Sequence, residues 1–261
     1  MKKWLALGLL ATLAVAATAA TCVVRNVRIT VIDDDAVVAG EMFNDSGVDI
    51  LNHEILVAFL DKDNDLIDTA SVVPCPRSLQ DGTSSFFAAS DSTIDPDDVK
   101  NSLWRINFNN SFKVGQTEDS DITISNVFAR RLGDDLKVTG TVKNNGEDEL
   151  EDVVVCIVVR DEDGKVVTVG KDASVSDLDE DDTDTFSITI NNVSDDDDVV
   201  TEVDVWVDGE IDGTLAEPAS DTGNDVDECS AATNTPTPGT PTDTPTPNPT
   251  ITPSPTATPC F

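Results

Sequence analysis

The sequence predicts an all-β chain in which one β-sandwich domain occurs twice. Three observations lead to this prediction. A stretch of the N-terminal half recurs in register in the C-terminal half, short segments of alternating apolar and polar residues are separated by turn residues, and long helical periodicity is absent. The chain has 261 residues, which is enough for two small domains.

The internal repeat is clearest in two blocks that follow each other without a gap. Residues 38–47 align with 138–147, and residues 55–63 align with 155–163. The residues that keep their type are Val38, Gly40, Asn44, Asp61 and Asp63, which align with Val138, Gly140, Asn144, Asp161 and Asp163. Two copies of one domain explain this register. We therefore expect equivalent residues, such as Asp61 and Asp161, to occupy equivalent hairpin positions.

The second copy contains segments of strand length separated by turns. The predicted strands cover residues 121–130, 136–143, 152–160, 165–171, 183–190 and 199–208. Several short strands of this kind are typical of an Ig-like β-sandwich. In the last strand Val203, Val205 and Val207 alternate with Asp204 and Asp208, so we expect one face to be buried and the other to be wet.

The chain divides into five predicted regions. They are a signal peptide over 1–20, a first Ig-like repeat over 21–109, a linker over 110–120, a second repeat over 121–210, and a disordered Thr/Pro-rich tail over 211–261. The Thr-Pro pairs of the tail favour an extended, solvated chain because proline fixes φ and removes a hydrogen-bond donor.

The N-terminus has the three parts of a secretory signal. Lys2 and Lys3 precede an apolar run from Trp4 to Ala17, and small residues follow. That run is shorter than the ~20 apolar residues of a spanning helix, and no later stretch is apolar enough to span a bilayer. The sequence thus predicts a secreted or cell-envelope protein with no transmembrane span. Cys22 offers an alternative, a lipid anchor, although Ala19 and Thr21 fit a lipidation signal poorly.

The charge balance narrows the classes of partner. The chain has 16 Lys and Arg against 51 Asp and Glu, a formal charge of −35. Binding to nucleic acid or to anionic lipid requires clustered cations, so neither is expected. The carboxylates are spread along the chain, which is typical of a solvated acidic surface and attracts cations. The expected partner is an unidentified protein or envelope component.

The second copy resembles the FxLYD family, small Ig-like modules of bacterial and archaeal envelope proteins. The residues that carry the resemblance are Val138-Thr139-Gly140-Thr141-Val142-Lys143-Asn144, Ile157-Val158-Val159-Arg160-Asp161 and Asp163-Gly164-Lys165, with Leu178 and Thr185-Phe186 later. Ile157, Val159 and Arg160 replace the Phe, Leu and Tyr of the family motif. The first copy keeps Phe59-Leu60-Asp61 but has Asn64 where the turn glycine is expected. The resemblance implies the sandwich fold and no catalytic residues.

No motif indicates catalysis or a bound cofactor. His53, the single histidine, lacks visible partners for a triad or a zinc site, and no nucleophile or phosphate-binding motif is present. Asp61, Asp63 and Asp65 begin like a Ca²⁺-binding loop, but Leu66 and Val72 stand where that loop needs Gly and Glu. A looser Ca²⁺ site at this hairpin is the alternative to plain solvated turns. We therefore expect a protein that is not an enzyme.

The cysteines and one apolar strand supply the remaining site predictions. Among five widely spaced cysteines, Cys22 and Cys75 are the predicted disulfide, in competition with lipidation of Cys22. The strand over 153–159 is apolar at every position, so Val154, Cys156 and Val158 point out of their sandwich if the alternate set fills its core. We interpret these three residues as a contact surface for the first domain, a second chain or a ligand; the alternative is the strand propensity of valine.

These predictions favour one function and leave a second open. The first is a secreted structural or display protein built from Ig-like modules. The alternative is an adhesive or ligand-binding extracellular module, assisted by Ca²⁺ or not.

Overall fold

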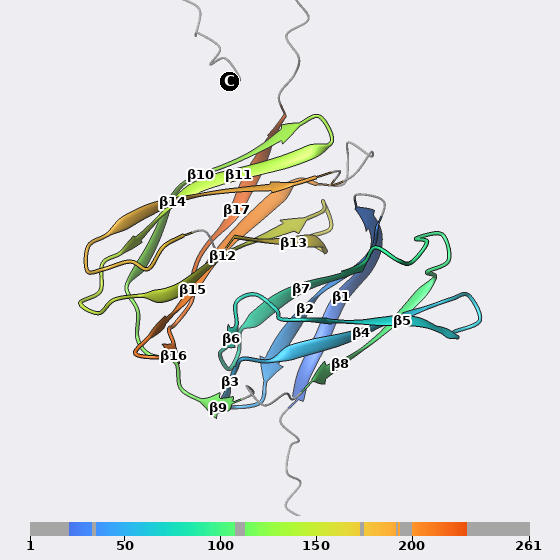
Figure 1. Ribbon diagram of the computed structural model, residues 1–261, viewed down its shortest axis with the longest axis horizontal. Helices are drawn as coiled ribbons and strands as arrows, with labels where there is room; N and C mark the ends of the chain where they lie inside the picture. The colour runs from blue at the N-terminus through green and yellow to red at the C-terminus, as the bar shows by residue number, and fades with distance from the viewer. Residues whose placement is uncertain are drawn as a thin grey trace, which may run out of the picture.

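The computed structural model is all-β and consists of two tandem sandwiches (Figure 1). It describes residues 21–32, 35–107, 113–172, 175–191, 193 and 200–228. The predicted signal peptide lies outside this range, as do the residues from 229 onward, which include the Thr-Pro repeats. Within it, no helix is long and apolar enough to cross a membrane.

The first repeat has three small sheets. One has the strand order β1-β2-β7, with β1 at Thr21–Ile32, β2 at Asp35–Asp45 and β7 at Ser84–Asp91. The facing sheet is β5-β4-β8, with β4 at Glu54–Leu60, β5 at Leu66–Val72 and β8 at Asn101–Asn107. The third sheet closes one end and consists of β6 (Ser78–Leu79), β3 (Asp49–Leu51) and β9 (Lys113–Gly115).

The second repeat follows the same strand order and adds two strands. β10 (Ile122–Leu132), β11 (Asp135–Asn144) and β14 (Thr183–Ile190) form one layer. β13 (Val166–Asp172), β12 (Glu151–Arg160) and β15 (Glu202–Ile211) form the other. The short β16 (Thr214–Leu215) pairs with β15, and β17 (Ala219–Glu228) joins the layers by pairing with both β15 and β10.

Residues at equivalent positions of the two copies make the same hydrogen bonds and lie at the same register shifts, which confirms the repeat. The β1–β2 register shifts between Arg25 and Arg28, and the β10–β11 register shifts between Ser125 and Phe128. The Asn44 side-chain amide donates to the carbonyls of Val48 and Leu79, and the Asn144 amide donates to those of Asp148 and Leu178. Asp61 and Asp161 each cap their hairpin by accepting two backbone N–H bonds.

The missing turn glycine of the first copy has a simple explanation. Asn64 adopts φ 64°, close to the 73° of Gly164, because asparagine tolerates the left-handed region better than other side chains. Both hairpins therefore keep the same turn with different residues.

Each sandwich encloses an apolar core to which its central strand contributes alternate side chains. Ile55, Val57 and Phe59 are fully buried in the first repeat, and Val155, Ile157 and Val159 are fully buried in the second. Glycine leaves room for a ring in both cores, since Phe87 packs over Gly40 and Phe186 over Gly140.

Two predicted boundaries are wrong. Residues 113–115 of the predicted linker form β9, which pairs with β3 of the first repeat. The second repeat does not end at residue 210, because β16 and β17 lie in the region predicted as tail. The ten residues of β17 are mostly polar, and their side chains stay partly or fully exposed up to Asp227. Backbone pairing holds this strand in place, so the apolar pattern that reveals buried strands is missing.

Candidate functional site

The most constrained surface of the molecule is the junction between its two repeats. The outer face of the β1-β2-β7 sheet lies on the outer face of the β13-β12-β15 layer, with β13 against β1, β2 and β7. Ile32, Val37, Ala39 and Phe86 of the first repeat belong to the same buried apolar cluster as the core of the second. The two sandwiches therefore share a continuous core instead of meeting at a flexible linker.

The stripe of Val154, Cys156 and Val158 lies at this junction. Cys156 forms a disulfide with Cys75 of the first repeat, with a Cα–Cα distance of 6.2 Å. Val158 is fully buried and belongs to the shared cluster, whereas Val154 is half-buried and lines a hollow together with Arg77. The first domain is thus what covers the outward apolar stripe.

The predicted Cys22–Cys75 disulfide is wrong. Cys22 is a free thiol that packs against the core of the first sandwich, and burial raises its pKa. Cys75 instead pairs with Phe86 through an isolated β-bridge and faces the second repeat. The two sulfurs therefore lie on different sides of the β1-β2-β7 sheet, a separation that spacing along the chain does not reveal. Lipidation of Cys22 stays a prediction.

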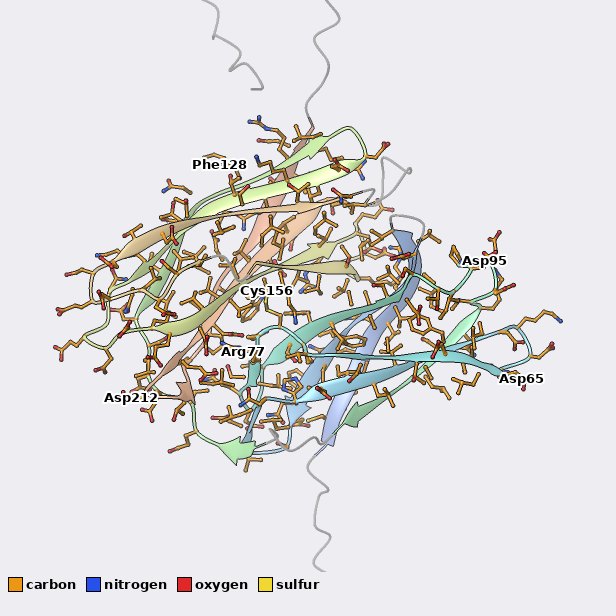
Figure 2. The ribbon with its side chains drawn as sticks, viewed as in Figure 1. Asp65, Arg77, Asp95, Phe128, Cys156 and Asp212 are labelled. Carbon is orange, nitrogen blue, oxygen red and sulfur yellow. A yellow bond between two sulfur atoms is a disulfide. The ribbon has the colours of Figure 1, made fainter. Side chains whose placement is uncertain are left out.

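Arg77 is the polar centre of the junction, between the repeats (Figure 2). Its backbone N–H and its Nε donate to the two carboxylate oxygens of Asp208, each at 2.7 Å. Its remaining guanidinium nitrogens donate to the Asp152 carbonyl at 2.9 Å and to Glu210 Oε1 at 3.4 Å. Lys171 donates to the carbonyl of Val73 nearby. Every one of these bonds joins one repeat to the other.

Burial shifts the pKa values of the groups around Arg77. It raises the pKa of the fully buried Asp208 carboxyl, and the charge and hydrogen bonds of Arg77 oppose that rise. It also lowers the pKa of the Lys171 ammonium. A buried carboxylate is stable only when it is paired and hydrogen-bonded, which is the role that Arg77 plays here.

A second ion pair and an aromatic contact extend the junction. Arg160 Nε donates to Asp204 Oδ2 at 2.6 Å, and the Arg160 guanidinium lies 5.0 Å from the ring centre of Phe86. The Phe86 and Trp206 rings lie 5.7 Å apart. The face of β15 that was expected to be exposed to solvent is therefore covered, because Asp204 and Asp208 are both buried. Its aspartates pair with arginines instead of meeting solvent.

The candidate Ca²⁺ residues form a turn. One carboxylate oxygen of Asp61 accepts the backbone N–H of Asp63 at 2.8 Å and that of Asp65 at 2.9 Å. Throughout the part of the chain that the structure describes, no group of three or more acidic, histidine or cysteine side chains is arranged to hold a metal ion. Asp61 thus stabilises its hairpin, and binding of Ca²⁺ there stays a prediction.

His53 is buried in the first repeat and not placed in a cleft. Its Nε2 lies 3.1 Å from Ser85 Oγ, and it occupies the position of Val153 in the second repeat. Burial lowers its pKa to about 4. A neutral, enclosed imidazole of this kind is a packing residue.

Comparisons with known proteins leave the family open. No protein-family model matches the sequence, and no curated protein is similar to it. Solved structures with weak similarity include a red sea bream transglutaminase, at 11% identity and TM-score 0.27, aligned over 78% of this chain and 32% of that one. A Bacteroides uniformis β-glucuronidase has 11% identity and TM-score 0.27 over 74% of this chain and 26% of its own. The chain therefore covers less than half of either structure.

The outer face of the β10-β11-β14 layer differs in chemistry from the rest of this acidic chain. Its centre carries aromatic, cationic and hydroxyl side chains and no carboxylate; the residues are Phe128, Arg130, Lys137, Thr139, Thr141, Thr185, Ser187 and Thr189. Phe128 is 64% exposed, and with Arg130, Leu132 and Lys137 it lines a hollow of about 270 Å³. Sequence analysis missed this face because its residues are spread over three strands.

Proposed function

We propose that the protein is a secreted, non-catalytic structural module of a cell envelope, in which two Ig-like repeats act as one rigid display unit. The observation that carries the proposal is the junction, where the Cys75–Cys156 disulfide and the Arg77–Asp208 pair join the repeats. A flexible tether would need neither. A rigid unit holds whatever it carries at a fixed distance and orientation.

Secretion is part of the proposal and has two supports. The N-terminal residues have the pattern of a cleaved signal peptide. Disulfides persist in oxidising compartments, and Cys75 and Cys156 form one. Membership of the FxLYD family is proposed on the same footing, since Asn144 and Asp161 of its motif are the residues that cap turns in this fold.

Distances between the repeats test the rigid unit. Spin labels attached at the exposed Val48 and Glu149 report on one repeat each. We expect a single narrow distance distribution in the oxidised protein. A broad distribution at neutral pH would contradict the display role, because the repeats would then move independently.

The processing of the N-terminus tests secretion. Mass spectrometry of the protein recovered from its native host should find a mature chain that begins near Thr21. A chain that retains Met1–Ala20 would contradict secretion through a cleaved signal. A diacylglyceryl group on Cys22 would show that the unit is anchored and not released.

The adhesive alternative is favoured by one feature. The Phe128 face combines an exposed ring with Arg130 and Lys137, which is the chemistry that retains an anionic partner. An envelope component held there, with or without Ca²⁺, would make the protein an adhesin. Binding of isolated envelope material that is lost in Phe128→Ser would support this alternative over a purely structural role.

A further inference from the structure

The junction between the repeats joins the outer faces of two different sheets of the sandwich. Each repeat has both of these sheets, so each repeat also has one such face outside the junction. The first repeat uses its β1-β2-β7 face and the second uses its β13-β12-β15 face. Two faces remain: the β5-β4-β8 face of the first repeat, equivalent to β13-β12-β15, and the β10-β11-β14 face of the second, equivalent to β1-β2-β7. Phe128 and Asp65, which belong to these two free regions, lie on opposite sides of the molecule, with Cys156 and Arg77 between them (Figure 2).

Both free faces carry large exposed apolar side chains. On the second repeat these are Phe128, which is 64% exposed, and Leu132, which is 45% exposed. On the first repeat Leu66 of β5 and Leu103 of β8 are each 62% exposed. In a soluble protein, gathered apolar side chains of this size mark an interaction surface.

Where the junction geometry would bring the two free faces together, one carries mostly cations and the other mostly carboxylates. Arg130 and Lys137 are directly opposed across β10 and β11, and Asp227 of β17 lies opposite Arg130 on its other side, so two cations lie beside one carboxylate there. In the junction, β13 packs on the β1-β2-β7 sheet, which is the equivalent of β10-β11-β14. If a second molecule repeated that packing, its β5, the equivalent of β13, would lie on β10-β11-β14. β5 follows the hairpin of Asp61, Asp63 and Asp65.

One junction contact shows where Phe128 would lie. Arg28 of β1 donates to Asp161 in the β12–β13 hairpin at 2.6 Å. Phe128 is the equivalent of Arg28, and Asp61 is the equivalent of Asp161. Beside Asp61 lies a hollow of about 320 Å³, where Ile67 offers apolar contact. Its other lining residues are three carboxylates and two lysines: Asp61, Asp97, Asp98, Lys62 and Lys100.

We propose that the β10-β11-β14 face of one chain binds the β5-β4-β8 face of a second copy, and so repeats the internal junction between molecules. Because the two faces differ, the contact is head-to-tail and continues into a chain or ring. The contact is non-covalent, because the first repeat has Leu56 at the position equivalent to Cys156. It is weaker than the junction, because the second repeat has Thr185 at the position equivalent to Phe86. The inference deepens the proposed structural role by giving the display unit a route to assembly.

Variants that disable one face at a time test the proposal. Phe128→Glu places a carboxylate on the β10-β11-β14 face, and Leu103→Glu places one on the β5-β4-β8 face, so each variant should block binding through one face. Both residues are exposed, so we expect the fold to be retained. At about 0.15 M NaCl, where the Debye length of about 8 Å screens the overall negative charge, wild-type protein should grow beyond a dimer as concentration rises in sedimentation velocity. Each variant alone should associate at least about tenfold more weakly.

The decisive measurement is the mixture of the two single variants. Leu103→Glu keeps the β10 face and Phe128→Glu keeps the β8 face, so an equimolar mixture should form a 1:1 dimer and nothing larger. The double variant should stay monomeric in every mixture. A wild type that stays monomeric, one that stops at a dimer, or a mixture that does not associate would each overturn the proposal. A monomeric wild type would leave the rigid display role intact, because the distance measurement between the repeats tests that role separately.

Discussion

Asp208 of the second repeat is fully buried and receives both a backbone and a guanidinium hydrogen bond from Arg77 of the first, each at 2.7 Å. A carboxylate in this position is stable only while the other repeat supplies its partner. The charge therefore makes the fit between the two repeats specific, even though burying an ion pair adds little net stability.

Removing one member of this pair should cost more than removing both. Arg77→Met leaves Asp208 buried without its guanidinium partner, and we expect it to lower the free energy of unfolding by about 3–5 kcal/mol. The double variant Arg77→Met/Asp208→Leu should recover most of that loss. The exposed Lys165–Asp163 pair is the control, and Lys165→Met should change stability by less than about 1 kcal/mol. Equal losses in the single and double variants, measured by urea unfolding, would show that Asp208 does not depend on Arg77.

The Cys75–Cys156 disulfide should be found by peptide mapping without reduction, with Cys22 recovered as a free thiol. The bond closes a loop with a sequence separation of 81 residues, for which loop entropy gives about 4.5 kcal/mol. Cys75→Ala/Cys156→Leu should lose a stability of that order, while Cys22→Ala should lose less. A Cys22–Cys75 peptide in the map would contradict the structure.

The neutral His53 should make the first repeat sensitive to acid. Its pKa is lowered to about 4 in the folded state, whereas an unfolded histidine titrates near its ordinary pKa of 6.5. The unfolded state thus binds more protons between these values, so stability falls as the pH drops from about 6.5 to about 4, by roughly 3 kcal/mol.

His53→Val, which copies the equivalent residue of the second repeat, should remove this part of the pH dependence. The carboxylates titrate in both proteins, so the difference between their unfolding free energies at pH 7 and pH 4.5 isolates the histidine. Parallel curves for the two proteins would mean that the imidazole is not buried in neutral form.

The core glycines should not tolerate a methyl group. A Cβ on Gly140 would lie 2.4 Å from Cζ of the buried Phe186, and one on Gly40 would lie 2.9 Å from Cζ of Phe87. Gly140→Ala should therefore destabilise by about 1–3 kcal/mol and Gly40→Ala by less. Thr141→Ala, at the next, outward-facing position of the same strand, is the control. A neutral Gly140→Ala would show that the ring moves aside freely.

Cations should stabilise the protein. With 51 acidic side chains against 16 basic ones, folding concentrates like charges, and salt screens their repulsion. The thermal midpoint should rise with NaCl. A larger rise with millimolar Ca²⁺ at equal ionic strength, lost in Asp63→Asn/Asp65→Asn, would locate a Ca²⁺ site at the Asp61 hairpin. A midpoint unchanged by either salt would mean that the acidity serves solubility alone.

The sequence by itself determined the parts of this protein that depend on local pattern. Alternating apolar and polar residues revealed strands such as residues 136–143, in which Leu136, Val138 and Val142 face the core, because a half-buried strand must alternate. Turn chemistry placed the Asp61 and Asp161 hairpins, because their side chains cap their own backbone. The strand β17 was missed since its side chains stay largely exposed and only its backbone is paired.

Only the tertiary structure decided which outer faces are covered. Asp204 and Asp208 have the pattern of a solvent-exposed face, yet both are buried, because Arg160 and Arg77 supply charges from segments distant in sequence. Cys75 bonds to Cys156 and not to Cys22 for the same reason: the side of a sheet to which a side chain points is local, but what lies opposite it depends on how the two repeats pack. Packing of this kind couples residues far apart in the chain, and no local pattern records it.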